Sequence, residues 1–257
     1  MIFYFSGTGN SYATALELSK KLTGESEDRL FDIAKLTHEK KYEFALEEGE
    51  KAGFVFPVYF GGLPAIVGKF IEKLQFEKEP EYLYGALTYG GFASGAAWML
   101  EQALLKSGLK LNAAYKLKMP ENYLLAFPTP SEESVNKTLD AAETALAEIV
   151  TAIEEKEDKQ PVANPVEKAA STLEYPLYYQ FRKTKPFYAD AQCVHCGACA
   201  ARCPARAIKM VDGIPTWVKE KCVFCMSCVR CGAIQYGDKL RGKKRYKHPI
   251  LQSGAAH

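Results

Sequence analysis

Eight cysteines at short, regular spacing are the residues of this sequence best suited to chemistry. They fall into two groups, CVHCGACAARCP with Cys193, Cys196, Cys199 and Cys203, and CVFCMSCVRCG with Cys222, Cys225, Cys228 and Cys231. Zinc sites commonly use two C-x-x-C pairs separated by a longer loop, whereas here three cysteines follow one another in steps of three. The spacing therefore favours iron–sulfur clusters over zinc, and over disulfides where thiols are kept reduced.

A second candidate for chemistry is the turn Ser6-Gly7-Thr8-Gly9-Asn10-Ser11, which follows the apolar run IFYFS and precedes a segment with helical spacing. Free backbone N–H groups at the start of a helix bind anions, and glycine lets the backbone approach them closely. The hydroxyl and amide side chains add donors without adding positive charge, which suits a phosphomonoester. Tyr12 stands where a dinucleotide fingerprint has its third glycine, and a P-loop lysine is missing. The alternative is a plain strand-to-helix turn.

These residues must be positioned by the alternating elements of the first part of the chain. Strands are predicted at IFYFS, RLFDIA, AGFVFPVYF, YLYGALTYGG and NAAYKLKM, and helices over 11–22, from Pro64, over 96–105 and from Ser131 to about 155. The alternation predicts an α/β fold with a doubly wound, five-stranded parallel sheet. Ligands of such sheets bind at the carboxyl ends of the strands.

Three further stretches fall at that same edge of the predicted sheet. FPVYFGGLP follows the third strand and TYGGFASG follows the fourth, and both combine glycines with aromatic rings. MPENYL follows the fifth strand and brings Asn122 and Tyr123 to the edge. An aromatic slot beside a phosphate-binding turn suits a flat ring such as a flavin.

About the first 157 residues resemble the flavodoxin family, on the turn SGTGNS and the loops just described. The resemblance implies FMN as cofactor, with the phosphate held by Ser6 to Ser11. The residues that it implies around the flavin ring are Pro57, Val58, Tyr59, Phe60, Gly61, Thr88, Tyr89, Gly90 and Gly91. Tyr59 and Tyr89 are the candidates for stacking on the ring, and simple interior packing is the alternative for both.

The run C-x-x-C-x-x-C-x-x-x-C-P, which ends at Pro204, resembles the bacterial two-cluster ferredoxins. The resemblance implies two [4Fe-4S] clusters with interleaved ligands. One would be held by Cys193, Cys196, Cys199 and Cys231, and the other by Cys222, Cys225, Cys228 and Cys203. The sequence departs from the pattern after Cys228, because two residues precede Cys231 where three are expected, and Gly232 replaces the proline. The departure leaves the assignment of Cys231 open.

Charge divides the 257-residue chain into two halves: residues 1–160 hold 17 Lys or Arg and 25 Asp or Glu, and residues 161–257 hold 16 and 6. The organisation that we predict is an FMN-binding domain over 1–158, an aromatic connector over 159–188 that packs between domains, a small α+β two-cluster domain over 189–238 and a basic tail over 239–257. The connector could instead contact a membrane. The tail could be solvated, dock on the acidic half, or attract an acidic redox partner.

The order of the two domains and the aromatic connector resembles the flavodoxin–ferredoxin fusion proteins of anaerobic bacteria and archaea. The resemblance implies a low-potential electron-transfer protein that couples one-electron transfer through two clusters to FMN. Its implied partner is a ferredoxin or a ferredoxin-dependent oxidoreductase.

The alternative is a flavin-dependent reductase of a small acceptor such as a quinone, a nitro compound, an activated alkene or oxygen. In that case Tyr123 is the candidate proton donor. Whether the chain is an enzyme stays open at this point, and a cysteine-rich nucleic-acid module is a third class that we do not expect. Without a predicted signal or membrane span, and with a regular array of reduced thiols, we expect a cytoplasmic protein.

Overall fold

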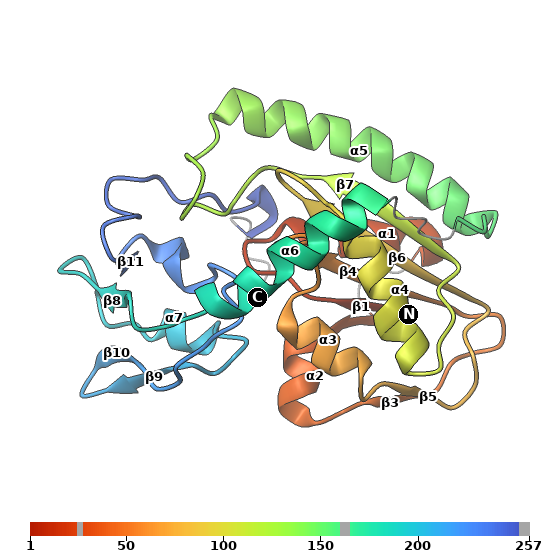
Figure 1. Cartoon of the computed structure of the whole chain (residues 1–257), viewed down its shortest axis with the longest axis horizontal. Coiled ribbons are helices and arrows are strands. Elements are labelled where there is room, and N and C mark those ends of the chain that lie inside the picture. Colours follow the sequence, from red (N-terminus) through yellow and green to blue (C-terminus); the bar gives the residue numbers. More distant parts are fainter. Residues whose placement is uncertain (25–27, 160–164, 252–257) are drawn as a thin grey trace.

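The computed structural model describes residues 1–24, 28–159 and 165–251 of the chain. An α/β domain takes up the first 159 residues, and a smaller domain with short strands follows the helix α6 (Figure 1). Residues 160–164 of the predicted connector and residues 252–257 of the predicted tail lie outside the described residues.

The first domain is built on one parallel sheet of five strands. These are β1 (Ile2–Tyr4), β2 (Leu30–Asp32), β4 (Lys51–Pro57), β6 (Tyr82–Tyr89) and β7 (Ala113–Lys118). Their order is β2-β1-β4-β6-β7, and every neighbouring pair is parallel. This topology confirms the predicted doubly wound, flavodoxin-like sheet. A short parallel pair, β3 (Glu43–Phe44) with β5 (Gln75–Phe76), lies outside it.

Helices cover both faces of the sheet, as the alternating pattern predicts. Their bounds are α1 (Asn10–Thr23), α2 (Ile33–Glu39), α3 (Ala65–Ile71), α4 (Ala96–Lys106) and α5 (Glu132–Glu154). One buried apolar cluster joins the sheet to α2, α3 and α4, and a second joins it to α1 and α5. Figure 1 shows α5 running along the outside of the sheet beside α1. The strands are consequently buried on both faces, and their carboxyl ends carry the loops of interest.

The predicted second strand RLFDIA extends further toward the C-terminus than the observed strand. The strand ends at Asp32, and α2 begins at Ile33. The reason is local: the Asp32 carboxylate accepts a hydrogen bond from the Ala34 backbone N–H at 2.7 Å, and this cap starts the helix inside the predicted strand. Ser131 caps α5 in the same way, because its hydroxyl accepts from the Ser134 N–H at 3.2 Å.

The aromatic connector contains a helix, α6 (Pro165–Phe181), which runs through Pro176. Tyr178 of this helix is fully buried. Its hydroxyl accepts a hydrogen bond from the Ala65 N–H at 3.1 Å and donates one to the Val223 carbonyl at 2.7 Å. One side chain of the connector is therefore bonded to both domains. No helix of the described residues is long and apolar enough to cross a membrane.

The small domain consists of two antiparallel strand pairs around two short helical turns. Its elements are β8 (Phe187–Ala189), α7 (Ala198–Ala201), β9 (Ile208–Val211), β10 (Ile214–Trp217), the 3-10 turn η1 (Cys228–Cys231) and β11 (Ile234–Tyr236), followed in the tail by a second 3-10 turn, η2 (Pro249–Leu251). β9 pairs with β10, and β8 pairs with β11. β8 begins two residues before the predicted boundary at 189, because it completes this second pair.

Candidate functional site

The turn after β1 presents backbone donors that have no side-chain cap. α1 begins at Asn10, and its N-cap Gly9, with a φ of 102°, makes no side-chain cap hydrogen bond among the described residues. Ser6 Oγ accepts from the Gly9 N–H at 3.2 Å, and Ser11 Oγ lies 2.8 Å from Thr88 Oγ1. Buried, uncapped N–H groups flanked by hydroxyls fit an anionic phosphate.

The predicted flavin residues surround one cavity of about 300 Å³ at the carboxyl ends of the strands. Those that line it are Ser6, Gly7, Thr8, Asn10, Ser11, Pro57, Val58, Tyr59, Phe60, Gly61, Thr88, Tyr89, Gly90 and Gly91. Gly9 is the exception, since it lines a neighbouring cavity between the domains. The three predicted loops therefore converge, and the proton-donor candidate Tyr123 lies in the same wall.

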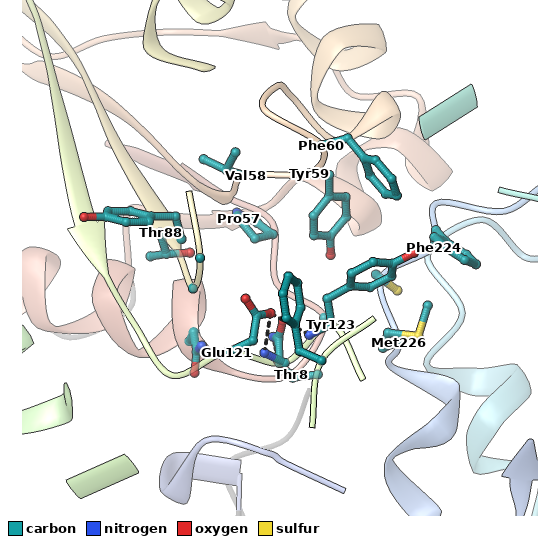
Figure 2. Close-up of a pocket in the computed structure, with 18 of the residues that line it drawn as sticks. Thr8, Pro57, Val58, Tyr59, Phe60, Thr88, Glu121, Tyr123, Phe224 and Met226 are labelled. Atoms are coloured by element: carbon teal, nitrogen blue, oxygen red, sulfur yellow. Dashed lines mark hydrogen bonds between the residues drawn. The ribbon is translucent and has the colours of Figure 1, made fainter. Parts of the chain in front are cut away.

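Aromatic rings form one side of the cavity. In Figure 2, Tyr59 points its hydroxyl into the cavity, with Phe60 and Tyr123 beside it. The Phe60 ring lies 5.5 Å from the Tyr123 ring and is stacked on Phe181 of α6 at 6.0 Å. Burial raises the pKa of Tyr123 to about 12, with a smaller contribution from Tyr236, so its phenol stays protonated at neutral pH. This slot fits a planar ring next to the phosphate-binding turn.

The loop after β7 contributes more than the sequence suggests. Glu121 Oε1 accepts from the N–H groups of Asn122 and Tyr123 at 2.9 and 2.7 Å. The Asn122 amide in turn donates to Thr8 Oγ1, which joins this loop to the phosphate-binding turn. Glu121 was missed because a single glutamate in MPENYL carries no motif. Its proximity to the turn depends on the order of strands in the sheet.

Four cysteines from two segments line a second, smaller cavity. These are Cys203, Cys222, Cys225 and Cys228, the set that the ferredoxin resemblance assigns to one cluster, hereafter the inner group. The Ala207 N–H donates to Cys203 Sγ and the Phe224 N–H to Cys222 Sγ, both at 3.3 Å. Burial raises the pKa of Cys225 to about 12. Convergent thiols with backbone donors to sulfur fit an iron–sulfur cluster.

The other four cysteines, Cys193, Cys196, Cys199 and Cys231, form the outer group. Cys199 lies in α7, which packs against the turn η1 that contains Cys231. Cys196 and Cys231 are exposed to solvent. Among the described residues, no three His, Cys, Asp or Glu side chains converge on a single-ion site.

The residue after Cys231 explains one departure from the ferredoxin pattern. Gly232 has a φ of 89°, a region closed to proline, whose ring holds φ near −65°. The shortened spacing is accommodated by the tight turn η1, which spans Cys228–Cys231. Glycine thus replaces the usual proline because the shorter segment must reverse with a positive φ.

The inner group touches the phosphate-binding turn directly. A Cβ atom on Gly7 would lie 2.1 Å from the carbonyl oxygen of Cys225, so only glycine fits at this point of contact. Phe224, Cys225 and Met226 also line the 300 Å³ cavity. Sequence reasoning missed this contact, since nothing in either motif indicates how the two domains pack.

The basic tail lies on the first domain and does not extend freely. The Tyr246 hydroxyl donates to Asn10 Oδ1 at 2.7 Å, and the His248 N–H donates to the Thr8 carbonyl at 2.8 Å. Lys243 Nζ donates to the carbonyls of Leu124 and Phe127 at 2.5 and 3.3 Å. Of the alternatives for the tail, docking on the first domain is the arrangement observed for residues up to 251, through backbone carbonyls and a tyrosine.

Comparison with known families supports the assignment of the small domain. Residues 185–231 match the family model of the 4Fe-4S dicluster domain. The chain joins a flavodoxin-like domain to a 4Fe-4S dicluster domain. The predicted iron–sulfur character of the second domain is thereby confirmed. No curated protein sequence matches the chain.

Several solved structures match the chain at low sequence identity. A protein described as a flavoprotein from Bacteroides uniformis is 16% identical, with 55% of this chain and 96% of that chain covered and a TM-score of 0.35. The flavodoxin of Streptococcus pneumoniae TIGR4 is also 16% identical, with 57% and 97% covered and a TM-score of 0.33. For rubredoxin oxygen:oxidoreductase of Desulfovibrio gigas the identity is 16%, the coverage 60% and 36%, and the TM-score 0.34.

Proposed function

We propose that this chain is a low-potential electron-transfer protein that couples two [4Fe-4S] clusters to one FMN. When bound, the clusters carry single electrons and the flavin accepts one or two, so the redox chemistry is supplied by the cofactors. The protein supplies binding, orientation and a short path between them. The inner group would hold one cluster, the outer group the other, and the loops after β1, β4 and β6 the FMN.

The observation that carries the proposal is that Cys225 lines two cavities at once. This residue lines the small cavity of the inner group and also the 300 Å³ cavity of the predicted flavin loops. A cluster ligand in the wall of a flavin site brings the two redox centres next to each other without an intervening side chain. Two adjoining sites are expected if electrons pass between the cofactors, but not if the two sites bind their cofactors for unrelated purposes.

The outer group supplies the route to a partner. Cys196 is exposed, and the neighbouring Val194 is 81% exposed. An exposed cluster edge in the half of the chain that carries excess positive charge suits an acidic redox protein such as a small ferredoxin. We propose that electrons pass from such a donor to the outer cluster, then to the inner cluster and then to the flavin, in the cytoplasm.

A second candidate function is the reduction of a small acceptor at the flavin. It is favoured by the apolar wall of Phe60, Tyr123 and Phe127 on the cavity and by the phenol that Tyr123 brings to that wall. A protonated phenol beside the ring could deliver the proton that two-electron reduction of an organic acceptor requires. A Tyr123→Phe variant with unchanged electron transfer to a protein partner but lost acceptor reduction would favour this function.

Cofactor analysis of the anaerobically purified protein tests the main proposal. We expect about one FMN and about eight irons per chain. Thr8→Asp places a carboxylate in the buried phosphate-binding turn and should weaken FMN binding by at least about 100-fold, since like charges close together cost several kcal/mol. The iron content should stay unchanged.

Thr8→Ser is the matched control, because it keeps the hydroxyl at this position. Its FMN affinity, measured by quenching of flavin fluorescence, should stay within about threefold of the parent protein. Zinc in place of iron would overturn the cluster assignment. FAD in place of FMN, or tight FMN binding by Thr8→Asp, would overturn the assignment of the phosphate-binding turn.

A further inference from the structure

Three arginines carry buried N–H donors that meet no acceptor. In the described part of the chain, the buried side-chain nitrogens without a hydrogen-bond partner are Nε and Nη1 of Arg182, Nε of Arg230 and Nε of Arg245. Buried polar groups are nearly always bonded, and a lost bond to a charged group costs more than one to a neutral group. All three arginines lie beside cysteines of the two groups, which indicates what their donors face.

Arg182 is fixed next to the inner group. It follows α6 directly, and its carbonyl accepts from the Cys222 N–H at 3.0 Å. Its guanidinium carbon lies 5.2 and 5.1 Å from the ring centroids of Tyr178 and Tyr179, which hold the side chain by cation–π contacts.

Arg230 lies two residues after Cys228, the last cysteine of the inner group in the sequence. It lies in η1 and lines the interdomain cavity together with Cys203 and Ser227. In the part of the chain that the structure describes, neither Arg230 nor Arg182 forms an ion pair with a carboxylate. Two half-buried cationic groups, each with at least one buried nitrogen, thus lie beside the inner cysteines without an ion-pair partner among the described residues.

Arg245 reaches the outer group from the tail. Its Nη1 donates to the carbonyls of Leu240 and Lys243 at 2.7 Å each, and its Nη2 donates to Gln235 Oε1 at 3.0 Å and to the Gly232 carbonyl at 3.4 Å. Four bonds therefore hold the guanidinium beside the residue that follows Cys231. Its Nε is the one nitrogen of this group left without an acceptor in the described residues.

We propose that these arginines are charge partners of the iron–sulfur clusters, with Arg182 and Arg230 serving the inner cluster and Arg245 the outer one. The inference rests on the proposed function, because it requires both clusters. A [4Fe-4S] cluster with four thiolates carries a charge of about −2 and exposes sulfur acceptors. It would supply both the negative charge and the hydrogen-bond acceptors that the arginines lack. Hydrogen bonds and positive charge at the sulfurs are established determinants of cluster potential.

The consequence is a higher midpoint potential for each cluster. Reduction adds one electron from the donor, which is oxidised, and makes the cluster more negative by one charge. Arginine keeps its proton throughout, so each guanidinium stabilises the reduced form more than the oxidised form and no proton moves. Burial acts in the opposite direction, since a site of low polarity disfavours the additional negative charge. The arginines offset that penalty, most of all at the inner group.

The test uses the full chain with both clusters, titrated with dithionite and redox mediators and followed by electron paramagnetic resonance. Arg182→Gln should lower the reduced-to-oxidised ratio of one cluster about tenfold at a fixed potential, which is about 59 mV for a one-electron couple. Arg245→Gln should shift the other midpoint. Arg182→Lys keeps the charge and should shift the midpoint by clearly less than Arg182→Gln.

Arg241→Gln is the matched control, because this exposed arginine bonds Tyr188 and Asp238 and should move neither midpoint. If Arg182→Gln retains eight irons and shifts no midpoint, or if Arg182→Lys shifts it as far as Gln, the inference is wrong while the proposed function stands. Should Arg182→Gln lose iron that Arg182→Lys keeps, the charge is needed to hold the cluster, which supports the inference. Iron lost from both variants alike overturns it, and absence of iron from the parent protein removes the proposed function itself.

Discussion

The two C-x-x-C-x-x-C loops have similar backbone conformations, but their side chains have different surroundings. His195 and Phe224 occupy equivalent positions with φ of 56° and 66°, and Gly197 and Met226 follow with φ of 74° and 60°. The repeat of these left-handed residues, three of them not glycine, gives both loops the same curvature. The side chains then decide the setting of each loop.

The equivalent residues His195 and Phe224 have opposite environments. His195 is exposed, and its Nδ1 lies 2.9 Å from the Gly213 carbonyl at the end of the β9–β10 hairpin. Phe224 is buried, with the rings of Tyr236 and Tyr123 at 5.7 and 6.0 Å. The comparison teaches that one loop geometry, used twice, places one set of cysteines near the surface and the other beside the 300 Å³ cavity.

The largest expected effect comes from removing one ligand of each loop at equivalent positions. Cys225→Ser and Cys196→Ser should each lose about four irons. Cys225→Ser alone should also weaken FMN binding, by about tenfold, because Cys225 is part of the wall of the flavin cavity. Iron analysis and flavin fluorescence titration measure the two effects. Equal FMN affinities in the two variants would contradict the difference between inner and outer loops.

A second test concerns the residues that follow the fourth cysteine of each run, Gly232 and Pro204. Gly232→Pro restores the usual ferredoxin residue but cannot adopt the φ of 89°, so the Cys231 segment should misplace its sulfur. We expect loss of the outer cluster, seen as about four irons per chain. Pro204→Gly should keep about eight irons, with a stability loss of about 1 kcal/mol. Full iron content in Gly232→Pro would show that this backbone conformation is not required.

Exchanging the equivalent side chains gives a smaller effect. Phe224→His places an imidazole among the rings of Tyr123, Phe187 and Tyr236, and we expect it to lower the free energy of unfolding by about 3 kcal/mol. His195→Phe at the exposed position should change it by about 0.5 kcal/mol or less. Urea unfolding of both variants under anaerobic conditions provides the comparison. Similar losses in the two would mean that the loops do not differ in packing as described.

The smallest expected effect is a pH dependence of the free energy of unfolding that comes from His248 in the C-terminal tail. Burial lowers the pKa of His248 to about 4 from the 6.5 of an unfolded chain. The unfolded state therefore binds a proton first, and stability should fall as the pH drops from 6.5 towards 4, by at most about 1.4 kcal/mol per pH unit. His248→Gln should remove this component. An unchanged slope in that variant would assign the pH dependence to other groups.

Much of the fold could be predicted from the sequence because its signals are local. Alternating apolar runs located the five strands of the sheet, and Ser131 marked the start of the last helix of the first domain. Errors occurred where a single cap competes with a strand pattern, as at Asp32. The helix α6 was not predicted, since an aromatic, proline-containing segment has no clear period and owes its form to contacts such as that of Tyr178 with both domains.

By itself the sequence determined the chemistry available to this protein: two sets of four thiols, a turn with uncapped donors and small side chains, and aromatic loops at one edge of a parallel sheet. Those properties depend on residue type and short spacing, which local geometry translates directly. Only the tertiary structure decided that Cys225 meets Gly7, that the tail lies on the turn after β1, and that buried nitrogens of three arginines lie near the cysteines. These contacts join segments far apart in the chain, and they depend on how the two domains pack on each other, which no periodicity within either domain encodes.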